Sequence, residues 1–389
     1  MPSLTSDVVR SLSGADTDAR LAAFERFAAA PFPTPQQEIW RYSRIDELHL
    51  DDFAYGTLTT TVTGAESFLV DVADGDGAAR SHADDSSDNR ELDLFGELNR
   101  AFMSPIHLRI PAGRSVADPI IVTHTMEDDG TACFPRLIVE AGEDSEVTVI
   151  ELFVSSESVT GIVMPVLQID AGQAARVKYL SVNELGAKVW MIANQQAEGR
   201  RDSSTLVSTV ALGGDYARVR THAKLTGRGG STRQVALYFA DGSQTHDFRV
   251  TQEHVAPKTF SDLLFKGAVN DVAHSVYTGL IKIGPEARGT EAFQTNRNLT
   301  LSEGAWAESV PNLEIETNDV KCSHASTVGP IDEEQRFYLE SRGIQPEIAE
   351  RLVVLGFFDE VLGQLPVGAF AGELRARIAS KLHRAVVSG

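Results

Sequence analysis

The sequence predicts a mainly β protein that carries helices at both ends. From about His107 to Cys322, short apolar runs rich in β-branched residues recur, and no strongly amphipathic helix separates them. This pattern excludes the alternating strands and helices of a doubly wound sheet, and it fits a β-solenoid or a β-sandwich. We therefore expect a helical N-terminal domain with an acidic linker at residues 1–95, a β core at 96–322 and a helical C-terminal domain at 323–389.

A weak internal repeat favours stacked coils. In four places a glycine at a turn is followed, five residues later, by the valine of a new strand. Turn-and-strand units that recur without hairpin signals are typical of a solenoid, in which each coil buries its apolar side against its neighbours. The spacing is irregular, so the sandwich stays open on pattern alone. The four pairs are Gly142 and Val147, Gly172 and Val177, Gly214 and Val219, and Gly230 and Val235.

The N-terminal region has helix signals of its own. Thr17 or Asp18 can begin a helix, and the prolines that follow residue 30 end it. We expect a second helix from about Pro35, with Trp40 and Tyr42 attaching it to the β core. Residues 71–93 are rich in Asp, Ser, Gly and Ala and lack the ligand spacing of a calcium loop, so they are expected to form an acidic, flexible linker.

Charge and composition narrow the function classes. The chain has 389 residues, with 35 Lys and Arg against 55 Asp and Glu, a formal net charge of −20. The electrostatic field of so negative a protein repels nucleic acid and anionic lipid, which argues against both as partners. No signal peptide or apolar run long enough to span a bilayer is present, and the two cysteines do not indicate a disulfide framework. We expect a soluble cytoplasmic protein.

The most informative stretch lies at the end of the β region. An alternating strand that includes Leu313 and Glu316 leads to Cys322 and His324, which point the same way if the second segment is also a strand. Thiolate, imidazole and carboxylate suit iron, but they give only part of a coordination sphere. The alternative is a buried free cysteine beside a histidine bonded to backbone. Cys133, between Ala132 and Phe134, is expected in the core.

The C-terminal region predicts three helices. Asp332 can cap the first, Gly343 can end it in a left-handed conformation, and Pro346 can begin the second. The third has an apolar residue at every fourth position. This stripe either packs as core or faces a partner protein. It consists of Phe370, Leu374, Ile378 and Leu382.

Enzyme signatures are not apparent. The sequence has no Walker A loop, no dinucleotide-binding glycine motif, no HExxH helix and no nucleophile elbow. Two cysteines cannot supply the four thiolates of a stable cluster. The one enzyme alternative is a β-helix carbohydrate-active enzyme, with Lys266, Lys282 and Arg297 near a carboxylate groove.

Four segments resemble a known family. They are PTPQQEIWRYSRIDEL, HVAPKTFSDLLFKGAVND, GLIKIGPEARGTEAFQTNRNLTLSEGA and NLEIETNDVKCSHASTVGPIDEEQRFYLESRGI. Together they resemble the SufB/SufD family, the scaffold proteins of the Suf iron–sulfur cluster assembly system. The likeness is closer to the SufD branch, because the chain is short and lacks the multi-cysteine N-terminal motif often found in SufB.

The resemblance implies a fold and a set of partners. The fold would be a right-handed parallel β-helix between helical domains, and the chain would be a non-catalytic subunit of a complex with SufB and the ABC-type ATPase SufC. The end of the β-helix would pair with SufB, and the C-terminal helices would dock SufC. Residues expected at this helical interface are Phe337, Tyr338, Arg342, Leu352 and Phe357.

The resemblance also gives the Cys322 and His324 pair a role. The two residues match the cysteine and histidine of the family's Lys-Cys-x-His motif, so they are expected to assist iron entry and to share iron or a transient cluster with SufB, with Glu316 as a further ligand. No cofactor is expected to stay on the isolated chain, and flavin on the complex is left open. A homodimer through the same β-helix end is the alternative assembly.

One position departs from the family pattern. The family commonly has glycine after this histidine, whereas this chain has Ala325. Because glycine permits a left-handed backbone that alanine resists, we expect the turn to be built differently here.

Overall fold

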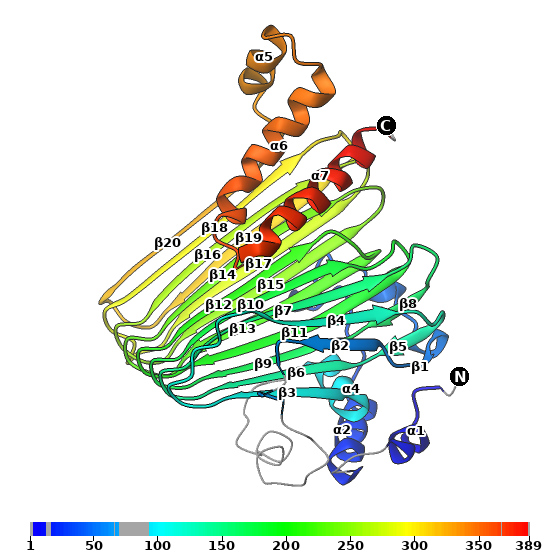
Figure 1. Cartoon of the computed structure of the whole chain (residues 1–389), viewed down its shortest axis with the longest axis vertical. Coiled ribbons are helices and arrows are strands. Elements are labelled where there is room, and N and C mark those ends of the chain that lie inside the picture. The colour runs from blue at the N-terminus through cyan, green and yellow to red at the C-terminus, as the bar shows by residue number, and fades with distance from the viewer. Residues whose placement is uncertain (1–2, 13–16, 66, 70–92, 367, 388–389) are drawn as a thin grey trace.

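A computed structural model describes residues 3–12, 17–65, 67–69, 93–366 and 368–387. The expected acidic linker at 71–93 lies outside the described residues except for Asp93. The remaining chain is a parallel β-solenoid with helices at both ends (Figure 1). The predicted mainly β fold with flanking helices is confirmed, and the solenoid replaces the sandwich.

Two sheets form the walls of the solenoid. The first sheet contains, in order, β1 (Ala54–Tyr55), β5 (Thr131–Cys133), β8 (Gly161–Val163), β11 (Val189–Gly199), β13 (Tyr216–Leu225), β15 (Thr245–His254), β17 (His274–Ile283) and β19 (Trp306–Ile315). A branch of three further strands joins this sheet at β11: β9 (Val166–Ala171), then β6 (Pro135–Ala141), then β3 (Ser104–Ile110). The second contains β2 (Thr59–Thr63), β4 (Ile120–Met126), β7 (Glu146–Ser155), β10 (Arg176–Glu184), β12 (Ser204–Ala211), β14 (Ser231–Ala240), β16 (Phe260–Val269), β18 (Thr290–Thr300) and β20 (Val320–Gly329).

Nearly all the strand pairs are parallel, and each coil lies directly on the one before it. The exception among the described pairs is β2 with β4, which is antiparallel. Paired residues of neighbouring coils lie 26 positions apart at Trp190 and Tyr216 and 32 apart at His274 and Trp306. Because the turns vary in length, the coil length varies, and the sequence repeat is correspondingly weak.

The predicted turn-and-valine repeat is partly right. Val147 and Val177 are register partners on β7 and β10, so the first two units are true successive coils. Val219 belongs to β13 in the first sheet, whereas Val235 lies in β14 of the second. A glycine turn precedes strands of both sheets, and the pattern therefore mixes two positions of the coil.

The N-terminal segment lies along the outside of the first sheet. It contains α1 (Ser6–Ser11), α2 (Thr17–Ala29) and α4 (Leu94–Phe102), and α4 is capped by the Asp93 carboxylate. The helix expected from Pro35 is wrong, because that region forms only 3₁₀ turns at Glu38–Trp40, Ile45–Glu47 and Leu50–Asp52. Its main chain is held by the solenoid instead of by a helix.

Two buried arginines hold this segment. Arg218 donates to the carbonyl of Ile39 at 2.7 Å, and Arg249 donates to the carbonyl of Arg41 at 2.5 Å. Both arginines are paired with Asp247, which is completely buried. The carbonyls thus bind side chains rather than the N–H groups of a following helical turn, which explains why no helix forms.

Both aromatic residues of the segment attach it to the β core, as expected. Trp40 is buried, its ring packs edge-on against Phe95, and the Arg218 guanidinium lies 3.8 Å from the centre of the Trp40 ring. The Tyr42 ring packs edge-on against Trp306 of β19, with the ring centres 5.5 Å apart, so the expected attachment to the β core is confirmed for both residues. Tyr42 is partly exposed and adopts a φ of 64°, a left-handed conformation that is rare for an aromatic residue.

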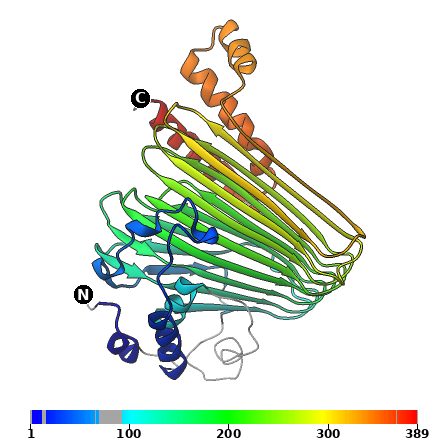
Figure 2. The same cartoon turned by 180° about the vertical axis from the view of Figure 1, so that it is seen from behind.

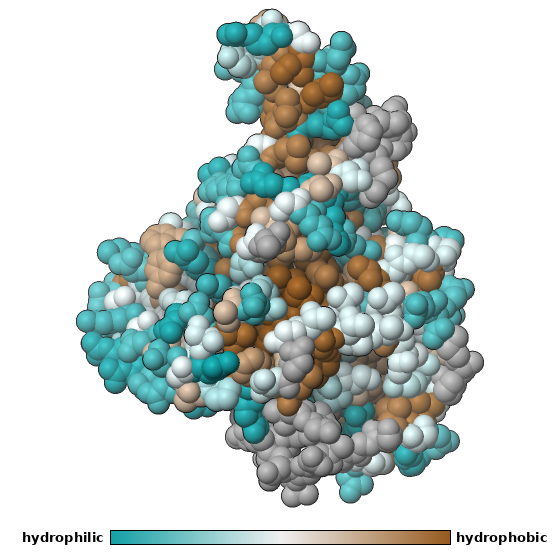
Figure 3. Space-filling view, in the orientation of Figure 1, coloured by the Kyte–Doolittle hydropathy of each residue, from teal (hydrophilic) through white to brown (hydrophobic). Residues whose placement is uncertain are grey.

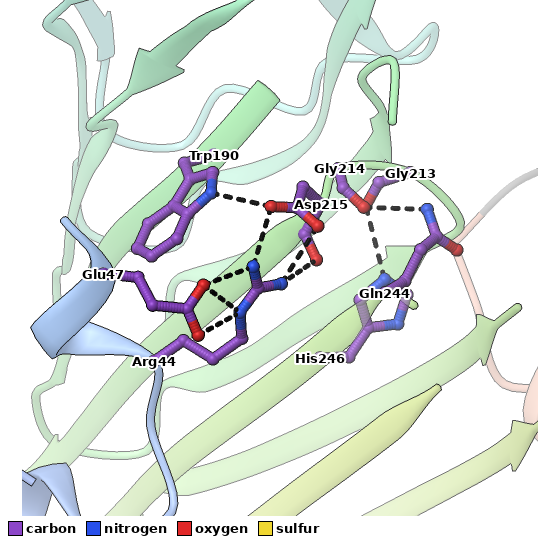
Figure 4. Close-up of polar contacts among 8 residues, drawn as sticks. All are labelled: Arg44, Glu47, Trp190, Gly213, Gly214, Asp215, Gln244 and His246. Atoms are coloured by element: carbon purple, nitrogen blue, oxygen red, sulfur yellow. Dashed lines mark hydrogen bonds and ion pairs between the residues drawn. The ribbon is translucent and has the colours of Figure 1, made fainter. Parts of the chain in front are cut away.

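A second polar contact fixes the segment one turn later. Arg44 lies between Glu47 and Asp215, and the Trp190 indole donates to the same Asp215 carboxylate at 3.0 Å (Figure 4). The loop before Asp215 is held from its other side, where Gln244 donates to the Gly214 carbonyl at 2.7 Å. The N-terminal segment is therefore attached to the wall of the solenoid by several buried or half-buried polar groups.

The C-terminal helices are α5 (Glu333–Ser341), α6 (Pro346–Leu362) and α7 (Ala371–Val387). The predicted cap and stop of the first helix are confirmed: the Asp332 carboxylate accepts from two N–H groups of α5, and Gly343 has a φ of 84°. The stripe of α7 packs as core against the outer face of the second sheet, together with the second half of α6. In contrast, α5 and the first half of α6 project away from the solenoid (Figures 1 and 2).

Candidate functional site at the open end of the solenoid

The last coil is formed by β19 and β20, and it has a neighbour on one side only. Among the described strands, β19 pairs with β17 and β20 pairs with β18, and nothing pairs with their other edges. Unpaired strand edges of this length are templates for pairing with another chain. We call this last coil, with its inner face, the open end.

Cys322 and His324 both lie on β20 and face the inside of the coil. Their register partners on β18 are Ala292 and Gln294, which are buried inner-face residues. Cys322 is half-buried against an apolar cluster that includes Ala292, and burial raises the pKa of its thiol. His324, one inner position further along, is exposed. The predicted side-by-side placement of the two residues on a strand is therefore observed.

The opposite wall of the open end is the inner face of β19. The Ser326 hydroxyl donates to the Ser309 hydroxyl at 2.6 Å across the coil. Since β19 and β20 run in opposite directions across the coil, this contact places Pro311 opposite His324 and Leu313 opposite Cys322. The open end thus presents one imidazole and one thiol between a polar bridge and an exposed apolar rim. Leu313 and Ile315 form that rim, and Val328 is an exposed apolar side chain on the far side of the polar bridge.

The third expected ligand, Glu316, lies just beyond the end of β19. Its backbone N–H donates to the Ile283 carbonyl, and its side chain is exposed. Within the described parts of the chain, no group of three or more His, Cys, Asp or Glu side chains is placed to hold a metal ion. At the open end the chain thus offers one sulfur donor, from Cys322, and one nitrogen donor, from His324. Coordination of iron by these residues stays a prediction.

Ala325 does not alter the backbone beside His324. β20 is continuous from Val320 to Gly329, and Ala325 is not among the residues with a positive φ. The expectation of a differently built turn is wrong, because this position lies inside a strand, where alanine fits without strain. The turn comes later, at Gly329 and Pro330, before α5.

A second exposed surface lies on the projecting helices. Phe337 is 71% exposed, and its neighbour Tyr338 is also exposed, with the Arg342 guanidinium 5.1 Å from the centre of its ring. On α6, Ile348 and Leu352 are exposed. We call Phe337, Tyr338, Ile348 and Leu352 the apolar helical face. The projecting helices at the top of Figure 3 show exposed hydrophobic surface, coloured brown. An exposed group of large apolar side chains is typical of a protein interface.

Phe357, the fifth residue expected at this interface, is placed differently. It is half-buried against the solenoid, and the Lys266 ammonium lies 4.6 Å from the centre of its ring. Phe357 therefore anchors the second half of α6 rather than extending the apolar helical face.

The residues of the carbohydrate-enzyme alternative do not form one site. Lys266 is buried under α6, where it pairs with Glu360 at 2.6 Å and donates to the Phe357 carbonyl. Arg297 is its register neighbour on the second sheet, whereas Lys282 lies on the first sheet beside Glu314. Residues on two different walls of the solenoid cannot line one groove.

The residue that sequence reasoning missed is Gln294, which lies beneath His324 in the adjacent coil. Its position could have been found by subtracting one coil length, thirty residues, from His324. That signal requires a known coil length, which the irregular repeat does not supply.

The fold and the open end together define a class: a β-solenoid protein whose last coil is unpaired at its edges and carries a half-buried cysteine and an exposed histidine on its inner face. No helix among the described residues is long and apolar enough to cross a membrane. Residues 123–357 match the family described as SUF system FeS cluster assembly, SufBD core domain. The chain therefore belongs to the SufBD family, and its role lies in iron–sulfur cluster assembly.

Individual relatives agree with this assignment. The chain is 32% identical to an iron–sulfur cluster assembly SufBD family protein of Mycobacterium tuberculosis, over 92% of each chain. It is 27% identical to the iron–sulfur cluster assembly protein SufD of Escherichia coli, over 90% of this chain and 89% of that protein. It is 31% identical to SufD of Bacillus subtilis, over 71% of this chain and 63% of that protein.

Proposed function

We propose that this chain is a non-catalytic scaffold subunit of a SufBCD-type complex. Its open end pairs with a SufB subunit, its projecting helices dock the SufC ATPase, and Cys322 with His324 assists iron entry and nascent cluster assembly at the junction. The observation that carries the proposal is the coincidence of two unpaired strand edges with two potential iron ligands. Iron and the cluster are cargo here, and the isolated chain holds neither stably.

Pairing with SufB is supported by the chemistry of the open end. The unpaired N–H and C=O groups of β19 and β20 can continue a sheet into another chain, and the apolar rim becomes buried when they do. A second chain also completes the ligand set, since iron needs more donors than one thiolate and one imidazole. A shared site would form only when the complex assembles.

Docking of SufC is supported by the apolar helical face. Phe337, Tyr338 and Leu352 are large apolar or aromatic side chains, of the kind that anchor interfaces, and they project from the solenoid where a partner can reach them. The helix that carries Leu352 continues into the packed half of α6. Movement of a bound ATPase would therefore be transmitted along α6 to the second sheet.

The role of His324 is tested in the reconstituted complex. His324→Ala should strongly reduce iron and sulfide content after anaerobic loading, while the matched control Ser323→Ala, one residue away on the outer face of β20, should not. The same purified complex shows by its absorption whether flavin is present. Undiminished loading of His324→Ala would remove the proposed role.

The role of the helical face is tested by binding. Phe337→Ala should weaken SufC binding by a factor of about 30, the loss expected for a hot-spot residue. Because its side chain is exposed, the free energy of unfolding should change by less than about 0.5 kcal/mol. Val272→Ala, an exposed apolar residue on a turn of the solenoid, is the control. Full SufC affinity in Phe337→Ala combined with Leu352→Ala would refute the docking site.

A homodimer is the second candidate assembly, because the same unpaired edges can meet their own copies. Sizing of the isolated chain, with and without SufB, distinguishes the two. A dimer that SufB does not dissociate would favour the homodimeric scaffold.

A further inference from the structure

Directly beneath the open end, one buried side chain has hydrogen-bonding capacity that the described residues do not use. Gln294 is the register partner of His324, so the two side chains face the same interior from adjacent strands, about 4.8 Å apart. Gln294 is 1% exposed, and neither its amide oxygen nor its amide nitrogen has a partner within the described chain. A buried polar group in this state costs about 1–3 kcal/mol.

A second unused group converges on the same point. The Tyr277 hydroxyl is fully buried and likewise lacks a partner among the described residues. Gly279 leaves the space that both groups enter, because a Cβ atom built there would lie 2.4 Å from Gln294 Nε2 and 2.4 Å from the Tyr277 hydroxyl oxygen. The Gln294 amide and the Tyr277 hydroxyl therefore occupy the space that a side chain at position 279 would fill.

The neighbouring polar residues on the same strand are different. Asn296 donates to the Tyr238 hydroxyl at 3.1 Å and to the Phe265 carbonyl, and Asn298 donates to Asn296 at 2.8 Å. These two residues of β18 are therefore satisfied within the described chain, whereas Gln294 on the same strand is not. Unpartnered buried groups also occur in other coils, as at Gln252, and Gln294 is the one in register with His324.

We propose that Gln294 is a positioning residue for His324: its Oε1 accepts the N–H of one imidazole nitrogen and leaves the lone pair of the other nitrogen facing out of the open end. The Tyr277 hydroxyl enters the same space beside Gly279 as this amide and limits where the amide can turn. The inference rests on the proposed function, in which His324 binds iron. Histidine ligands generally donate their second ring N–H to an acceptor, and this contact fixes the ring and strengthens the ligand.

The His324 side chain is exposed. When metal binds to the imidazole nitrogen that faces out of the open end, the ring rotates so that its other N–H reaches Gln294 Oε1. The opposite wall offers Pro311, which has no N–H group or polar side-chain atom, and the nearby hydroxyls of Ser309 and Ser326 are already bonded to each other. Gln294 is then the polar group aligned beneath the ring by the register of the sheet.

The test compares two glutamines in the SufB- and SufC-containing complex. Gln294→Leu keeps the approximate volume and removes both polar atoms, so it should fold and should weaken ferrous iron binding by about 10–100-fold. Gln294→Glu keeps an acceptor oxygen and should restore most of the affinity. Gln252→Leu is the matched control, since Gln252 is equally buried and unpartnered among the described residues but lies on β15, away from His324.

A spectroscopic readout separates positioning from packing. In the complex loaded with Zn²⁺, the ring N–H proton of His324 should be protected from exchange with Gln294 present, and Gln294→Leu should abolish that protection. If His324→Ala loses iron but Gln294→Leu keeps wild-type affinity and protection, the Gln294 role is overturned while the proposed function stands. If His324→Ala keeps full iron affinity, the proposed function is overturned, and the positioning role falls with it.

Discussion

Asp247 is the centre of the contacts that hold the N-terminal segment to the solenoid, and replacing it with asparagine should release that segment. Its carboxylate accepts from Arg218 at 2.5 Å, from Arg249 at 2.6 Å and from the Tyr216 hydroxyl at 2.8 Å. Asp247→Asn preserves the shape but leaves two buried guanidinium groups without a counter-ion. The two guanidinium groups that bind the carbonyls of Ile39 and Arg41 thus lose the carboxylate that holds them in position.

The magnitude follows from burial. Removing one partner of a buried ion pair costs about 3–5 kcal/mol, because the remaining charge is left uncompensated. Burial alone would raise the pKa of Asp247, but Arg218 and Arg249 outweigh it and hold the pKa below its ordinary value. A carboxylate with a lowered pKa stabilises the fold above its unfolded pKa of about 3.9, and this contribution is lost as the pH falls through the lower folded value. The difference between wild type and Asp247→Asn should therefore disappear in acid.

The assay is urea unfolding combined with hydrogen exchange of residues 38–44. We expect a lower unfolding midpoint and faster exchange in that segment for Asp247→Asn. The control is Asp144→Asn, because Asp144 pairs with Arg176 at the exposed surface and its loss should cost at most about 1 kcal/mol. Equal stability of the two variants at neutral pH would refute the reasoning.

Three further predictions concern the core, the thiols and the interior of the coil. Ile378→Ala should lower the free energy of unfolding by about 2–5 kcal/mol, measured in urea, because Ile378 is fully buried between α7 and the second sheet. In the native chain a thiol reagent should modify Cys322 before Cys133, since burial raises the pKa of Cys133 to about 11 and leaves it almost no exposure; equal rates would contradict this. Gly279→Ala should cost about 1–3 kcal/mol by overpacking, measured by thermal unfolding, and unchanged stability would show that the two groups above it move freely.

Local signals in the sequence were sufficient for the C-terminal region. Asp332, Gly343 and Pro346 act as cap, stop and start because each role depends on the residue itself and on the backbone near it. The α7 stripe packs as core because four-residue spacing places its members on one face of a helix. The placement of Cys322 and His324 followed in the same way from strand alternation.

Long-range contacts explain what the sequence did not predict. The region after Pro35 has helix-forming residues, yet its carbonyls are bound by Arg218 and Arg249, about 180 to 210 residues away. Nothing local to Gln294 marks it as the neighbour of His324, because that relation exists only once the register of the coils is fixed. The sequence likewise does not distinguish the half-buried Phe357 from the exposed Phe337 on adjacent helices.

The two ends of the solenoid differ in how far their inner faces are covered by the rest of the chain. Leu108 and Leu313 occupy equivalent inner positions in the first and last coils, yet Leu108 is 0% exposed and Leu313 is 38% exposed. At the first end, Ala65 and Phe68 pack over the inner face. At the last end, α6 and α7 could have served as a cap, but they fold back onto the outer wall of the second sheet. Because stacked repeats require a cap to stay soluble, an end left open beside Cys322 and His324 is best explained as a surface that a partner subunit covers.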